Sequence, residues 1–243
     1  MQATRTKKVK NLNKLMRERM ELLNFMRNKV ALLTGKMGKG KSTNAVYLAK
    51  WTAYLFGVPV VQVMTNLGLT PEFGPVTKIT IKDFLEQLVL LDQVSTEIDE
   101  ANITDGREMD AYLMHAKEHR GLVLYNCVIL IDEFQKLVLS RRPNDRVGLN
   151  VNEFITQARH YKCTMIGTTP NVRNLDRMVR DQISWICVPD YNPHTKWFTL
   201  RFQGEDGRIQ FETYAPDIWP LFNSWTPAGF RVKHIEKALA QDV

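Results

Sequence analysis

The chain has 243 residues, of which 44% are apolar, and a formal net charge of +7. This length allows a substantial buried core but not two large domains. The sequence has no long uncharged apolar run and no apolar signal-peptide core, so it predicts neither an integral membrane segment nor a cleaved leader. Cys127, Cys163 and Cys187 are far apart within apolar runs, which indicates buried thiols in a reducing compartment and argues against disulfides or a zinc site.

The surplus of positive charge is confined to the first 29 residues. They hold nine basic and two acidic side chains, a difference equal to the net charge of the whole chain. Apolar residues recur there at steps of three and four, which predicts an amphipathic helix with a basic opposite face. These apolar residues are Val9, Leu12, Met16, Met20 and Leu23. Such an arm suits DNA phosphate or an acidic partner, unless its apolar stripe docks on the protein's own body and its basic face is merely solvated.

Beyond the arm, short apolar runs alternate with helical patterns. In chain order the predicted elements are strand 30–34, helix 42–56, strand 58–64, loop 66–76, helix 81–92, a polar acidic stretch at 95–107, helix 107–119, strand 127–131, loop 141–148, helix 151–161, strand 164–168, helix 172–180, strand 183–188, a hairpin of 196–203 and 208–214, and helix 231–240. Continuous apolar strands alternating with helices predict an α/β three-layer sandwich around a mainly parallel sheet. The expected organisation is a basic helical arm (1–29), a core (30–190), and a hairpin and helical extension of the same domain (191–243).

A glycine-rich loop follows the first predicted strand. Residues 35–42 (GKMGKGKS) match the phosphate-loop pattern G-x-x-x-x-G-K-[ST] between a strand and a helix. Glycines let the backbone point its N–H groups at an anion, and the helix adds its positive end. Lys41 is expected to reach the β- and γ-phosphates of ATP, and the Ser42 hydroxyl to ligate Mg²⁺. The residues predicted to bind the nucleotide are Gly35, Lys36, Met37, Gly38, Lys39, Gly40, Lys41, Ser42 and Thr43.

Lys36 has two interpretations. Some dimeric P-loop ATPases carry an extra signature lysine at this place in the loop. The neighbouring glycine usual in those proteins is replaced here by Met37, which favours a solvent-facing charge.

Two carboxylates follow the predicted strand at 127–131. Asp132 is expected to hold Mg²⁺ through water, and Glu133 to act as the general base toward the attacking water. Aspartate followed by glutamate is typical of ATPases that do mechanical work. The run Leu88–Asp92 (LVLLD) also ends in aspartate, but no glutamate follows and the segment also fits a helix. The sequence therefore favours Asp132.

A family resemblance lies between residues 132 and 181. The elements that carry it are a strand ending in Asp132-Glu133, the loop Ser140–Arg142, the helix end Ala158–Tyr161, the strand end Thr168–Pro170 and the segment Leu175–Arg180. This order resembles the FtsK–HerA superfamily of P-loop ATPases. It looks most like genome-packaging ATPases of membrane-containing icosahedral viruses, and is similar to zonula occludens toxin-like assembly ATPases of filamentous phages. The resemblance covers residues 30–190 and implies a RecA-like, additional-strand P-loop NTPase fold.

In additional-strand ATPases, a polar side chain at the end of the third strand contacts the γ-phosphate and the attacking water. Thr169 is the first candidate for this catalytic role and Thr168 the second, with plain strand-end capping as the alternative. The superfamily usually has glutamine there, so the chain departs from the pattern at Thr169.

The resemblance also implies a function. It predicts a self-assembling ring, expected to be a hexamer, that translocates double-stranded DNA into a viral capsid. The host cytoplasm and the virion are the expected locations, and capsid or membrane-associated viral proteins are further partners to consider. The alternatives are a phage-extrusion ATPase and a nucleotide switch acting through a protein partner. Such rings need an arginine that reaches a neighbour's γ-phosphate. Candidates are Arg141, Arg142, Arg159, Arg173, Arg177 and Arg180.

Overall fold

The computed structural model describes residues 23–63, 67–137 and 146–223. Most of the predicted arm helix, the predicted helix at 231–240, and Arg141 and Arg142 lie outside these ranges. In the described part of the chain, no helix is both long and apolar enough to cross a membrane. The division of the chain at residues 29 and 190 stays a prediction.

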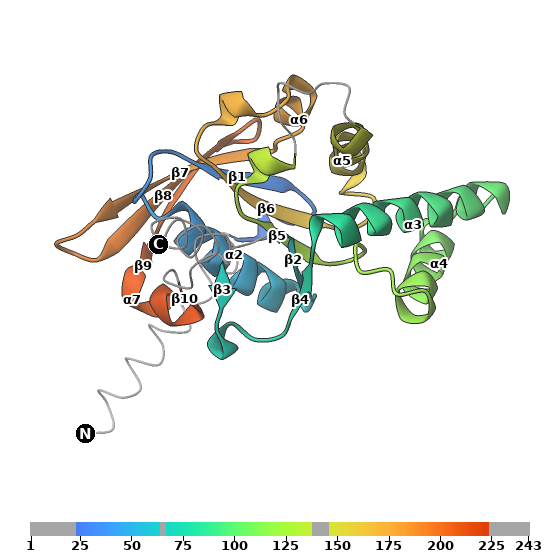
Figure 1. The fold of residues 1–243 in the computed structure, drawn as a ribbon, viewed down its shortest axis with the longest axis horizontal. Helices are drawn as coiled ribbons and strands as arrows, with labels where there is room; N and C mark the ends of the chain where they lie inside the picture. The colour runs from blue at the N-terminus through green and yellow to red at the C-terminus, as the bar shows by residue number, and fades with distance from the viewer. Residues whose placement is uncertain (1–22, 64–66, 138–145, 224–243) are drawn as a thin grey trace, which may run out of the picture.

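Eight described strands form one sheet in the order β4-β2-β5-β6-β1-β7-β8-β9 (Figure 1). Its strands are β1 (Val30–Thr34), β2 (Val60–Val63), β4 (Val76–Ile79), β5 (Val128–Ile131), β6 (Thr164–Thr169), β7 (Trp185–Asn192), β8 (Trp197–Gly204) and β9 (Gly207–Tyr214). From β4 to β7 every pairing is parallel, and β7, β8 and β9 pair antiparallel. The predicted mainly parallel sheet is confirmed, and the predicted hairpin extends its edge. A separate two-stranded ribbon pairs β3 (Gly68–Leu69) with β10 (Phe222–Asn223).

Helices cover both faces of the sheet, as predicted for a three-layer sandwich. The described helices are α2 (Lys41–Phe56), α3 (Ile81–Glu100), α4 (Gly106–His119), α5 (Arg146–Gln157), α6 (Arg177–Asp181) and α7 (Ala215–Ile218). Side chains alternate between the faces along β1: Val30 and Leu32 join the cluster under α3, α4 and α5, while Ala31 and Leu33 join the cluster under α2. Because β5 is buried on both faces, its sequence is continuously apolar, as is that of β1 up to Leu33.

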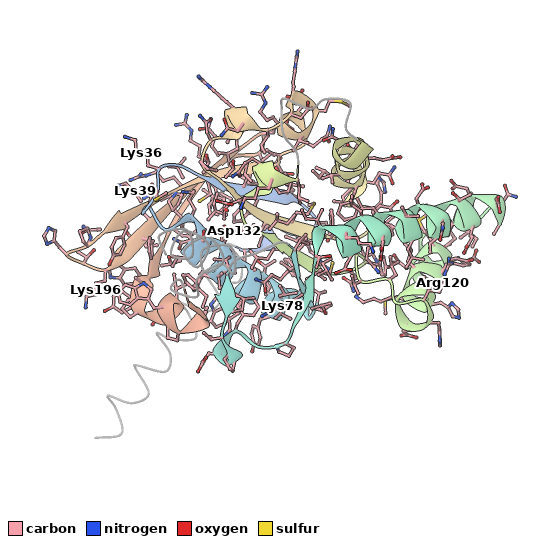
Figure 2. The ribbon with its side chains drawn as sticks, viewed as in Figure 1. Lys36, Lys39, Lys78, Arg120, Asp132 and Lys196 are labelled. Carbon is pink, nitrogen blue, oxygen red and sulfur yellow. The ribbon has the colours of Figure 1, made fainter. Side chains whose placement is uncertain are left out.

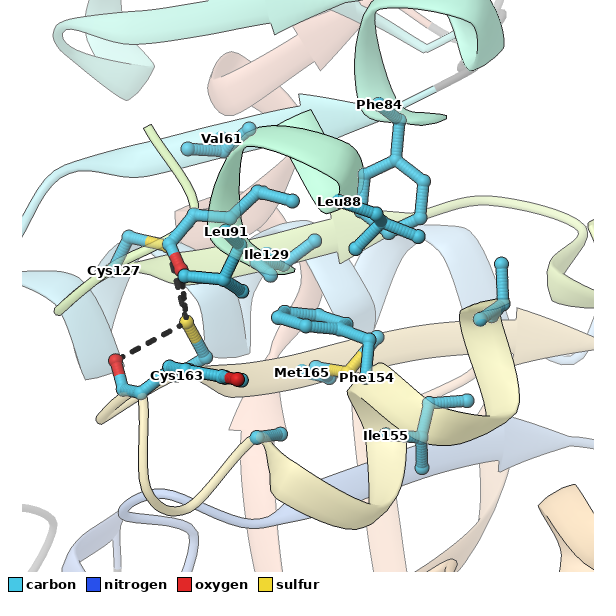
Figure 3. Close-up of a cluster of buried hydrophobic side chains, with 14 of the residues drawn as sticks. Val61, Phe84, Leu88, Leu91, Cys127, Ile129, Phe154, Ile155, Cys163 and Met165 are labelled. Atoms are coloured by element: carbon cyan, nitrogen blue, oxygen red, sulfur yellow. Dashed lines mark hydrogen bonds between the residues drawn. The ribbon is translucent and has the colours of Figure 1, made fainter. Parts of the chain in front are cut away.

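Figure 3 shows the first of these clusters, where α3 and α5 pack on β2, β5 and β6. Phe84 of α3 meets Phe154 of α5 edge to face, with ring centroids 6.0 Å apart. Cys127 and Cys163 lie in the same cluster with their sulfurs 3.7 Å apart. All three cysteines are free and buried, and burial raises the pKa of Cys163 and Cys187. The predicted buried thiols are therefore confirmed.

The structure corrects several predicted boundaries. The predicted helix 172–180 is a 3-10 turn at Val172–Asn174 followed by the separate helix α6. Strand β4 begins at Val76, at the end of a predicted loop, and α3 continues to Glu100, beyond its predicted end at Asp92 and into the polar acidic stretch. The hydroxyls of Ser95 and Thr96 donate hydrogen bonds to backbone carbonyls four residues earlier, so these polar residues are accommodated within the helix. A capping box of Thr80 and Asp83 fixes its start. Helix α5 begins five residues before the predicted Val151 and ends at Gln157, before the predicted Tyr161.

We expect Gly204→Ala to destabilise the protein by about 1–3 kcal/mol, the usual range for overpacking. A Cβ at Gly204 would lie 2.2 Å from the Ser184 carbonyl oxygen and 2.8 Å from the Trp185 ring, so β7 and β8 would have to separate. Gly106→Ala is the matched control, because a Cβ there meets nothing within 4 Å and α4 should gain helix propensity. Denaturant unfolding of both variants is the measurement; equal stability of the two would contradict this packing.

Candidate nucleotide site

The glycine-rich loop joins the carboxyl end of β1 to the first turn of α2. Gly38 and Gly40 have φ angles of 78° and 82°, a region that residues with a side chain rarely occupy. At Gly40 a Cβ would also lie 2.2 Å from the ring of Phe198. The loop therefore needs glycine at position 40 both for its backbone conformation and for the close approach of β8.

The first turn of α2 is open to an anion. Gly40 precedes the helix and no side chain caps it, and the first turn has no acidic residue. By contrast, side chains of Thr80, Asp105 and Asp176 cap α3, α4 and α6. The free N–H groups and positive end of α2 are what a phosphate group would bind.

Lys41 is half-buried at this turn. Its ammonium donates a hydrogen bond to the Lys36 carbonyl at 3.1 Å. Burial lowers the pKa of Lys41, and the negative charges of Asp132 and Glu133 oppose this shift. The ammonium therefore lies close enough to Asp132 and Glu133 to be attracted by both carboxylates. It also lies beside the loop in which a phosphate would bind.

Hydroxyls from two different elements converge on one carboxylate. The Asp132 carboxylate accepts a hydrogen bond from the Ser42 hydroxyl at 2.9 Å and another from the Thr168 hydroxyl at 2.6 Å. The Thr168 oxygen in turn accepts the backbone N–H of Glu133 at 2.9 Å. This convergence is possible because β6 lies between β1 and β5 in the sheet.

Glu133 has an unusual backbone. Its φ of 56° and ψ of 54° place it in the left-handed region, which costs a non-glycine residue about 1–2 kcal/mol. Its carboxylate forms an ion pair with Lys136 in the 3-10 turn Phe134–Lys136 that follows. Strain of this kind tends to persist where function requires a particular side-chain direction.

Ser42 and Asp132 fit a magnesium ion. A hydroxyl and a carboxylate oxygen 2.9 Å apart are hard oxygen donors, the type that Mg²⁺ prefers, and they lie next to the phosphate loop. An ion held there would have few protein ligands, as is usual when phosphate and water supply the others.

The remaining predicted residues are placed as follows. Figure 2 shows Lys36 and Lys39 at the outer edge of the loop and Asp132 further in. Lys39 pairs with Asp190 of β7 at 2.7 Å, which holds the pKa of that carboxyl below its usual range. Met37 is almost fully exposed and Thr43 is half-buried. Thr169 is buried, and its hydroxyl donates to the Asn171 carbonyl at 3.2 Å, so Thr168 rather than Thr169 contacts the two carboxylate residues.

Sequence reasoning missed the support that the hairpin gives to this loop. Asn44 is fully buried in α2 and donates to the Gly40 carbonyl at 2.8 Å. Its side-chain oxygen accepts the buried Thr213 hydroxyl of β9 at 2.9 Å. The polar amide of Asn44 within the predicted helix was the available signal, because a buried amide needs a hydrogen-bond partner.

We expect Thr213→Val to weaken binding of a fluorescent ATP analogue by about tenfold, a change of 1.4 kcal/mol. Valine keeps the shape but leaves the Asn44 amide oxygen buried without a donor, so the Gly40 contact loosens. Thr213→Ser restores the hydroxyl and should restore affinity. If the valine and serine variants bind the analogue equally well, the hydrogen bond does not position the loop.

Comparisons with known proteins agree with this geometry at the level of fold. The conjugation coupling protein TcpA of pCW3, solved with ATPγS, aligns with 13% identity and a TM-score of 0.50 over 77% of this chain. ATPases 2 and 3 of EccC from Thermomonospora curvata align with 16% identity and a TM-score of 0.51 over 76% of it. The chain spans 61% of the length of the TcpA structure and 37% of the EccC structure.

The DNA-packaging ATPase B204 of Sulfolobus turreted icosahedral virus is also similar, with 13% identity and a TM-score of 0.48 over 76% of this chain and 96% of its own. No curated protein sequence matches the chain. The model of the ATPase family associated with various cellular activities (AAA) matches residues 31–187. This segment contains the loop, Asp132 and Glu133 and covers well over half of the sequence, so the chain belongs to the AAA family of ATPases.

Proposed function

We propose that the chain is an ATP-hydrolysing motor of FtsK–HerA type that translocates double-stranded DNA, with the packaging of a viral genome as its use. The observation that carries the proposal is the convergence of Ser42, Asp132 and Thr168 beside the phosphate loop, with Glu133 adjacent. A phosphate loop that only bound a nucleotide would not need a second carboxylate at the same strand end.

Each residue has a role in hydrolysis. Lys41 leaves the Lys36 carbonyl to pair with the β- and γ-phosphates. In the partly buried site the attraction between its ammonium and the phosphates is stronger than it would be in water. Glu133 takes the proton of the attacking water, for which it must leave Lys136. Thr168 holds Asp132 and the Glu133 backbone in place and is a positioning residue. Mg²⁺, held by Ser42 and Asp132, would neutralise charge on the phosphate oxygens.

The motor assignment is supported by the sequence pattern over residues 132–181. A ring of identical subunits is the usual form of the translocating P-loop ATPases that this sequence pattern resembles. Among the predicted arginines within the described residues, Arg159, Arg173 and Arg177 are exposed and able to face a neighbour.

We expect Lys41→Ala to abolish productive ATP binding, because no other ammonium in the described loop has the same half-buried position at the start of α2. Glu133→Gln should keep ATP binding but lower turnover by a factor of about 10²–10⁴, since an amide cannot accept the proton. Lys78→Ala, at an exposed lysine of the edge strand β4, is the control and should behave as wild type. Wild-type turnover by the Glu133→Gln variant would remove Glu133 from this role.

A second experiment tests the motor itself. Steady-state ATP turnover should rise when linear double-stranded DNA is added, because a motor couples hydrolysis to movement along its track. Single-stranded DNA of equal phosphate concentration is the comparison, and raised salt should weaken the effect as phosphate contacts are lost. Turnover that is indifferent to double-stranded DNA would favour the nucleotide switch instead.

A further inference from the structure

A groove of about 440 Å³ lies between α3, α4 and α5. Its floor is apolar and buried, and consists of Leu88, Leu91, Ile98, Leu113 and Phe154. This volume falls in the range of about 300–1,000 Å³ that suits the binding of a ligand or a few side chains. The groove takes no part in the nucleotide site, whose residues lie on the loop after β1 and at the ends of β5 and β6.

The rim of the groove is negative. Asp92 and Asp99 of α3 and Glu153 of α5 are exposed along it, and none of them has an ion-pair partner among the described residues. Burial is the main cause of the raised pKa of Tyr161, and the charges of these three carboxylates add to it. The negative charges of all three carboxylates therefore reach the Tyr161 hydroxyl, which lies in the groove wall.

Helix α3, which is acidic, projects beyond the central sheet (Figure 1). It has six acidic residues and a single basic one, Lys82. In Figure 1, α3 extends past the edge of the sheet with α4 beside it, so this part of the helix pair is open to a second molecule. The surface suits a partner with apolar side chains for the floor and several positive charges for the rim.

The chain itself has a segment with this chemistry. Residues 1–22 hold seven basic and two acidic side chains, together with Val9, Leu12, Met16 and Met20 at helical spacing. Their net charge of +5 is opposite in sign to that of the three carboxylates on the groove rim. We propose that residues 1–22 of one copy dock in the groove between α3, α4 and α5 of a second copy. This proposal rests on the proposed function in one respect, which is that the partner is a second copy of the same chain, as in the proposed ring.

The place where the arm joins the body favours docking in the groove of a second copy over docking in the groove of the same copy. Phe25 packs edge to face on Trp185 and Phe202, with ring centroids 4.9 and 5.1 Å away. These rings belong to β7 and β8, at the end of the sheet opposite the groove in Figure 1. An arm that joins one end of a subunit and a groove at the other end make a head-to-tail contact. Repeated contacts of this kind form a ring when the rotation between neighbours closes, and a filament when it does not.

The test uses full-length variants. An arm variant carries Lys7→Gln, Lys8→Gln, Lys10→Gln and Lys14→Gln, and a groove variant carries Asp92→Asn, Asp99→Asn and Glu153→Gln. A control variant loses three exposed carboxylates that do not line the groove, through Glu118→Gln, Glu205→Gln and Glu212→Gln. Association is measured by sedimentation at low ionic strength, with and without ATP, and unfolding midpoints check that every variant is folded.

We expect the wild type and the control to associate, and the arm and groove variants each to associate at least about tenfold more weakly. Mixing the arm variant with the groove variant should restore pairs, because one supplies an intact groove and the other an intact arm. Wild-type association by either variant, or a mixture no better than its components, would overturn the proposal. Because association is also measured without nucleotide, a failure of ATP to change association would bear on the proposed function alone.

Discussion

The carboxylate of Asp132 is the shared acceptor on which the site depends. Ser42 reaches it from the first turn of α2, and Thr168 reaches it from the end of β6. Both contacts require β6 to lie between β1 and β5 in a fixed register, with Leu33 opposite Thr168. A slip of one residue in β6 would turn Thr168 to the other face of the sheet. The apolar core that sets this register is therefore part of the catalytic arrangement.

The phosphate loop depends equally on a part of the chain that follows the family segment. Phe198 fills the space beside Gly40, and Thr213 completes the hydrogen bonds of Asn44. Both residues belong to the antiparallel β8–β9 hairpin, which lies after residue 187, where the family match ends. A loop with a free glycine backbone is thus held by side chains from a different element, which limits the entropy it would otherwise lose on binding an anion.

Much of this arrangement could be predicted from the sequence because its signals are local. The apolar runs of β1, β5 and β6 and the glycine-lysine loop each depend on neighbouring residues. The choice between Thr168 and Thr169 could not be made in this way, since adjacent strand residues point to opposite faces and the two are chemically identical. The Asn44–Thr213 contact joins residues 169 positions apart, beyond the reach of any local pattern. The length of α3 was missed because Ser95 and Thr96 favour a loop until their hydroxyls find helix carbonyls.

The left-handed backbone at Glu133 has a consequence for how this protein can change. Glycine would relieve the strain there, and a laboratory selection for heat resistance alone would tend to accept it. The gain would come at the one position where the proposed proton acceptor stands. At residue 133 a substitution that raises thermal stability would therefore lower turnover. A more stable variant that keeps its activity would need stabilising substitutions elsewhere in the fold.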